Sequence, residues 1–82
     1  MKVTYRNGIP TVASLERIID NRPGFRISDI YSLKYPRIVV SGEIGNANAE
    51  QVMLDLKEHG IEVASFEPSK GMSNGMILVK PK

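Results

Sequence analysis

The chain has 82 residues, a net charge of +2 and no cysteine. A chain of this length forms one domain, residues 1–82, with a thin core, because folding at this size buries only about 60–65% of the unfolded chain's surface. The lack of Cys excludes a disulfide framework, a thiolate zinc site and a cysteine nucleophile. No apolar run approaches the roughly 20 residues of a membrane span, and no signal peptide opens the chain, so we expect a cytoplasmic protein with no membrane contact.

The charges are unevenly distributed along the chain. Residues 1–41 carry seven Lys and Arg against three Asp and Glu, whereas residues 42–82 carry four against six. Every Arg lies in the first half. Arg matches phosphate and carboxylate groups and stacks on aromatic rings, so this half is a candidate for a basic binding surface. The alternative is that the two halves interleave in the fold and their charges mix.

The first part of the chain predicts a strand and then an amphipathic helix. Lys2–Arg6 alternates apolar and polar residues, as a half-buried strand does. A helix is expected over 11–22, with Thr11 or Ser14 as N-cap, and it ends because Pro23 disfavours helical geometry at the residue before it. Its apolar face consists of Val12, Leu15, Ile18 and Ile19.

Two strands are expected next. The first opens at Phe25 and continues to Leu33, with a slip in its alternation near Asp29 that a bulge would repair. After a turn over 34–37, Ile38–Val40 forms an unbroken β-branched run. Such a run is typical of a central strand that is covered on both faces, or covered on one and contacted by a partner on the other.

The second half repeats this order. Gly42–Ala47 is expected to be a loop, and Asn48 with Gln51 has the form of a capping box that opens a second helix, which ends before Gly60. A strand is expected from Ile61 to about residue 67. A flexible loop rich in turn residues, 68–75, and a last strand over 76–80 follow.

The predicted order is therefore β-α-β-β-α-β-β, an α+β fold. Its first six elements resemble the ferredoxin-like plait, in which two helices cover one face of a mainly antiparallel sheet, here of four or five strands, and leave the other face open. The resemblance is one of layout and assigns no functional residue. The expected core is Leu15, Ile18, Ile19, Ile38, Val40, Val52, Met53, Leu56, Ile61 and Val63.

Little in the sequence points to catalysis. The only histidine, His59, falls in the last turn of the second predicted helix, where a structural role is expected. Asp55 and Glu58 flank Lys57 and are typical of solvated helix surface. Gly42–Gly45 lacks the Lys and the glycine spacing of the nucleotide-binding fingerprints. We therefore expect no enzymatic activity, no catalytic residue, no cofactor and no metal ion.

Aromatic and cationic side chains interleave on the strands expected in the first half. Small sheets bind single-stranded nucleic acid in this way, with bases stacked on rings and phosphates held by Arg or Lys. The basic-aromatic Gly-Phe-Val run of an RNA-recognition motif is absent. The residues in question are Tyr5, Arg6, Phe25, Arg26, Tyr31, Lys34, Tyr35 and Arg37.

Tyr and Arg are equally typical of protein-binding hot spots, and Met72 and Met76 beside a Gly-rich loop offer adaptable contacts. The favoured interpretation is a small regulatory protein that binds another protein as an adaptor or inhibitor, by analogy with phage and mobile-element proteins that mask a host enzyme. Nucleic-acid binding by the first half is the alternative, and a homodimer through an edge strand or the open sheet face is a further expectation. The expected contact residues are Arg6, Arg26, Lys34, Tyr35, Arg37, Lys70 and Met72.

Overall fold

A short hairpin begins the computed structural model, which describes residues 2–28 and 37–82. Strand β1 (Tyr5–Arg6) pairs with β2 (Ile9–Pro10) in a two-stranded sheet of its own. Asn7 and Gly8 between them have φ angles of 53° and 79°, the two positive values that a tight Asn-Gly hairpin turn requires. The first strand therefore stays out of the main sheet, and the ferredoxin-like plait is not confirmed.

Helix α1 (Val12–Ile19) follows and is capped by Thr11, as predicted. The Thr11 hydroxyl accepts a hydrogen bond from the Ser14 amide at 3.3 Å. The helix ends at Ile19 rather than at residue 22, because Asp20 and Asn21 adopt left-handed conformations with φ of 54° and 56°. Asp and Asn tolerate this conformation better than most residues, so they end the helix before Pro23 can.

The main sheet contains four strands in the part of the chain that the structure describes. They are β3 (Phe25–Ile27), β4 (Arg37–Val40), β5 (Val63–Glu67) and β6 (Gly75–Val79). Their order is β3-β4-β6-β5 and every neighbouring pair is antiparallel. The α+β class is thus confirmed. The bulge predicted near Asp29 and residues 34–36 of the turn predicted over 34–37 lie outside the described residues, whereas Arg37 is the first residue of β4 rather than part of a turn.

Helix α2 (Gly42–Glu58) begins earlier than predicted. Its N-cap is Ser41, so the expected loop over 42–47 is helical and the capping box at Asn48 is wrong. The Asn48 side chain instead donates to the carbonyl of Ile44 one turn earlier, at 2.9 Å. Tertiary packing outweighs the low helix propensity here, because Gly45 is buried against the chain at Gly24.

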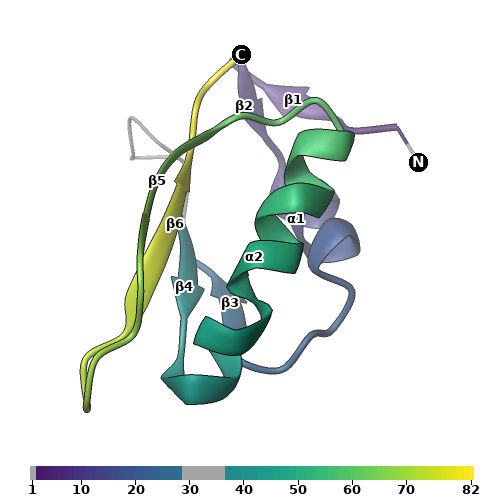
Figure 1. Ribbon diagram of the computed structural model, residues 1–82. Helices are drawn as coiled ribbons and strands as arrows, with labels where there is room; N and C mark the ends of the chain where they lie inside the picture. The colour runs from purple at the N-terminus through teal and green to yellow at the C-terminus, as the bar shows by residue number, and fades with distance from the viewer. Residues whose placement is uncertain (1, 29–36) are drawn as a thin grey trace.

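Both helices lie on the same side of the main sheet (Figure 1). Between the layers a hydrophobic core brings together buried residues of α1, α2, β4 and β6, with Ile61 from the segment before β5. Met53 and Val63, which the sequence placed in the core, are only partly buried at its margin. The cluster consists of Leu15, Ile18, Ile19, Ile38, Val40, Ala49, Val52, Leu56, Ile61, Ile77 and Val79.

A tight turn joins β5 to β6 where the sequence predicted a flexible loop. Lys70 and Ser73 exchange two backbone hydrogen bonds of 2.9 and 3.0 Å, and Gly71 between them has a φ of 58°. The base of this hairpin is fixed to the start of α2. Asn46 donates to the Ser69 carbonyl at 2.9 Å and accepts from the Ser69 amide at 2.7 Å.

Candidate functional site

The face of the main sheet that points away from the helices is the first candidate site. Ile38, Val40, Ile77 and Val79 are buried against the helices. Because successive side chains of a strand point to opposite faces, the residues between them face the other way. No helix in the described ranges lies on that side (Figure 1). The open face is thus built from residues that alternate with the core.

The strand register arranges the open face in two rows, because directly paired residues share a face. One row crosses the sheet as Arg26, Val39, Met76 and Glu67. The second crosses it as Arg37, Leu78 and Ser65. We use "open face" below for these seven residues.

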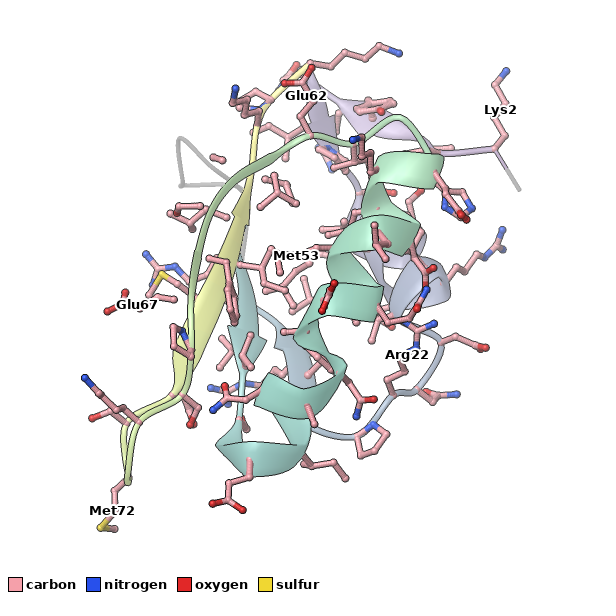
Figure 2. The ribbon with its side chains drawn as sticks, in the orientation of Figure 1. Lys2, Arg22, Met53, Glu62, Glu67 and Met72 are labelled. Carbon is pink, nitrogen blue, oxygen red and sulfur yellow. The ribbon has the colours of Figure 1, made fainter. Side chains whose placement is uncertain are left out.

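The open face has an apolar centre between unlike charges. Met76 and Leu78 on β6 are half-buried, whereas Val39 on β4 is buried, with 8% of its surface exposed, so the accessible apolar surface comes from β6. The cations stand on the β3–β4 side, whereas Glu67 stands on the outer strand β5. Figure 2 shows Glu67 projecting on the side of the sheet away from α2. Such a surface suits a ligand that carries apolar groups together with both signs of charge.

Arg37 is held in place on this face. Its carbonyl accepts hydrogen bonds from the amide and the hydroxyl of Ser28, both at 3.2 Å, which extend the β3–β4 pairing by one residue. The Nε atom of Arg37 is buried without a hydrogen-bond partner among the described residues. A buried donor without a partner is costly, and a carboxylate or carbonyl oxygen would satisfy it.

The tip of the β5–β6 hairpin is the second candidate contact. Met72 is fully exposed there, at 105% of its reference surface, and Lys70 beside it is also exposed. Figure 2 shows Met72 projecting from the end of the hairpin, away from the body of the protein. Because Ser69 is bonded to Asn46 on α2, the tip is presented on a fixed base rather than on a free loop.

The predicted contact residues do not form one surface. Arg26 and Arg37 share the open face, and Lys70 and Met72 share the hairpin tip. Arg6 lies on β1, at the opposite end of the molecule from that tip (Figure 1). Lys34 and Tyr35 lie outside the described residues.

The described aromatic residues are not on the open face. Phe25 pairs with Val40 and Phe66 pairs with Ile77, so both side chains lie on the helix side of the sheet. Tyr5 belongs to the β1–β2 hairpin, where the Lys82 ammonium lies 4.7 Å from the centre of its ring. Tyr31 falls outside the described ranges. The described part of the open face therefore offers no ring on which a base could stack.

Sequence reasoning identified Met76 as an adaptable contact but missed Glu67 and Leu78, which also come from the second half of the chain. Glu67, Met76 and Leu78 join Arg26 and Arg37 there through strand pairing. The alternation of Gly75–Val79 contained a signal, because one set of its residues had to face away from the core. What the sequence lacked was the strand order, which places β6 directly beside β4.

A polar cluster joins the helices on the other side of the molecule. Arg22, which follows α1, forms an ion pair with Asp55 of α2, and the Gln51 amide donates to the same carboxylate at 3.0 Å. These two hydrogen bonds, the one from Gln51 first, lower the pKa of Asp55. His59 Nδ1 donates to the carbonyl of Asp55 at 2.8 Å, at the end of the helix. The Arg22 contact holds the chain after α1 against α2, and the His59 contact lies at the end of α2.

Over residues 2–28 and 37–82, no three carboxylate or imidazole side chains gather closely enough to hold a metal ion. Neither of the helices described there is long and apolar enough to cross a membrane.

Comparison with known proteins finds no family model, no curated protein and no solved structure that matches this chain.

Proposed function

We propose that this chain is a small non-catalytic binding protein, an adaptor or inhibitor, that holds a protein partner on its open face. The observation that carries the proposal is the composition of that face. Met76 and Leu78 form an apolar centre beside the buried Val39, with Arg on one side and Glu67 on the other. Protein interfaces combine an apolar centre, enriched in Met and Arg, with a polar rim in the same way.

Two features favour a protein over nucleic acid as the ligand. A phosphate backbone is bound by several positively charged side chains. Glu67, in contrast, places a negatively charged carboxylate in the same row as Arg26. Single-stranded nucleic acid is also bound through stacked rings, and the described part of the open face carries none. A partner with an acidic group opposite Arg37 and a basic group opposite Glu67 fits both rows.

The hairpin tip supplies a second contact. Met72 is unbranched and flexible, so it can fill an irregular apolar pocket on a partner, while Lys70 beside it can meet an acidic group. Because β5 and β6 run from the open face to the tip, one partner can touch both. Arg6 stands apart from this surface and is not part of the proposal.

The test measures whether variants, each changed on one surface of the protein, still retain a partner from native lysate. Arg26→Glu and Met76→Glu change the open face, and Ile44→Glu is the matched control on α2, where Ile44 is 52% exposed. We expect one protein to be retained with or without nuclease, to be lost with either open-face variant and to remain with the control. A disrupted contact at an interface centre weakens binding by about 2 kcal/mol or more, roughly 30-fold.

Two results would contradict the proposal. Retention that is equal for all three variants would place the contact elsewhere on the molecule. Recovery of mixed nucleic acid, with affinity that falls steeply as salt is raised, would favour the alternative function, in which Arg26 and Arg37 contact phosphates. Circular dichroism of each variant checks that the fold is intact.

A further inference from the structure

A second surface lies at the edge of the main sheet, beside α2. Strand β5 is the last strand in the order β3-β4-β6-β5, so the backbone groups along its outer side lack a strand partner in the described chain. Between this strand and α2 runs an open groove of about 380 Å³. The groove is lined by Glu50, Met53, Leu54, Lys57, Ile61, Glu62 and Val63.

Apolar side chains are exposed along the same edge. Leu54 on α2 is 49% exposed, and Phe66 on β5 is 38% exposed on the helix side of the sheet. They are two of the four large apolar residues that are exposed in the described part of the chain. Exposed apolar groups beside an unpaired strand are features of surfaces that can pair with another chain.

The charges on this side of α2 are complementary to themselves. Glu50 lies one turn before Leu54 and Lys57 lies about one turn after it, so opposite charges flank one apolar side chain. Neither has an ion-pair partner among the described residues. A two-fold axis near Leu54 would place each Glu50 opposite the Lys57 of another copy, because the two helices would then run antiparallel.

We propose that the occupant of this edge is a second copy of the same chain. The two β5 strands pair antiparallel about a two-fold axis perpendicular to the sheet, which puts the helices of both copies on the same side. Leu54 of each copy then approaches the groove of the other, and two Glu50–Lys57 ion pairs close the contact. The self-complementary charge pattern favours a second copy over an unrelated protein.

The contact must use both α2 and β5. The pairing of β5 with β6 shifts register between Val63 and Ser65, and such an irregularity limits the length of regular strand that an edge can offer. The paired strands alone are therefore too short to hold the dimer together. The contact between the two α2 helices supplies the remaining buried area. The dimer leaves both open faces uncovered, so this inference does not rest on the proposed function.

The test is the mass of the purified protein in solution, measured by sedimentation over a range of concentrations. We expect a dimer, whereas Leu54→Arg and Lys57→Glu are expected to be largely monomeric. The charge reversal replaces two attractions with two repulsions, which raises the dissociation constant by about tenfold or more. Arg17→Glu is the matched control, because Arg17 is exposed on α1 and its charge changes by the same amount.

A charge swap distinguishes loss of the dimer contact from loss of the folded structure. The double variant Glu50→Lys with Lys57→Glu restores opposite charges across the two-fold axis, so it is expected to regain the dimer that Lys57→Glu loses. A wild-type protein that stays monomeric up to about 1 mM would overturn the inference. A dimer that is unaffected by Leu54→Arg, or a swap that fails to restore association in a folded double variant, would do so as well.

Discussion

Asp55 has a structural role that its sequence surroundings do not predict. It sits among charged neighbours that are typical of a solvated helix surface, yet its carboxylate receives hydrogen bonds from Gln51 and Arg22. The contact with Arg22 joins the chain after α1 to the last turn of α2. No local pattern reveals this pairing, because Arg22 and Asp55 are distant in sequence and meet only when the helices pack side by side.

The pH dependence of stability tests this contact. The hydrogen bonds from Gln51 and then Arg22 hold the pKa of Asp55 below its ordinary value, so the folded state favours the charged carboxylate. That stabilisation is complete above the unfolded pKa of about 3.9 and is lost as pH falls through the lower folded pKa. We expect Asp55→Asn to lower the free energy of unfolding by about 0.5–1 kcal/mol at neutral pH, with a difference that shrinks below about pH 4.

The measurement is urea unfolding of both proteins across that pH range. Glu58→Gln is the control, since Glu58 is exposed on the same helix and has no ion pair in the described chain. A deficit for Asp55→Asn that remains constant from neutral to acidic pH would show that the carboxylate charge is not what stabilises the contact.

At the scale of elements, α2 shows where local signals mislead. Gly42, Gly45 and the Asn residues at 46 and 48 lower helix propensity, so the sequence predicts a loop and a late start. Yet a side chain at Gly45 would lie 2.8 Å from the Gly24 carbonyl oxygen and 2.9 Å from the Val40 side chain. The glycine is required by close packing between the helix start and the sheet, and only the tertiary fold makes that visible.

The Asn46 side chain links α2 to the β5–β6 hairpin, so its removal should make the hairpin tip more mobile. Asn46→Ala removes both hydrogen bonds to the Ser69 backbone. We therefore expect the free energy of unfolding to fall by about 1–3 kcal/mol and the Ser69 amide to exchange faster. Asn48→Ala is the matched control, because within the described residues the Asn48 side chain bonds to Ile44 of the same helix and not to the hairpin.

Amide hydrogen exchange followed by NMR measures both variants. If Asn48→Ala accelerated exchange at Ser69 as much as Asn46→Ala did, the effect would reflect general fraying of α2 rather than loss of the link between the helix and the hairpin.

For the whole molecule, periodicity and turn residues predict much of the architecture. The α+β class, the two helices and most of the core follow from apolar spacing, because burial determines which residues recur on one face. The place of the first strand does not follow. Asn7–Gly8 encodes a hairpin with Ile9–Pro10, and this pairing is satisfied locally rather than within the main sheet.

The candidate site could be predicted only in part for the same reason. Arg26 and Arg37 were identified from their residue type, and the register brings them to one face. Their apolar and acidic neighbours come from β5 and β6, which are remote in sequence. The position of Arg6 relative to Arg26 and Arg37 depends on strand order, which the residue types along the chain do not encode.

The most direct measurement of the central claim is hydrogen exchange of the protein with and without its retained partner. The account predicts slower exchange or shifted signals centred on β4, β6 and the hairpin tip, including Arg37, Met76, Leu78 and Met72, with α1 unchanged. A footprint on the helix layer that leaves those strands unaffected would contradict the claim that the open face binds the partner.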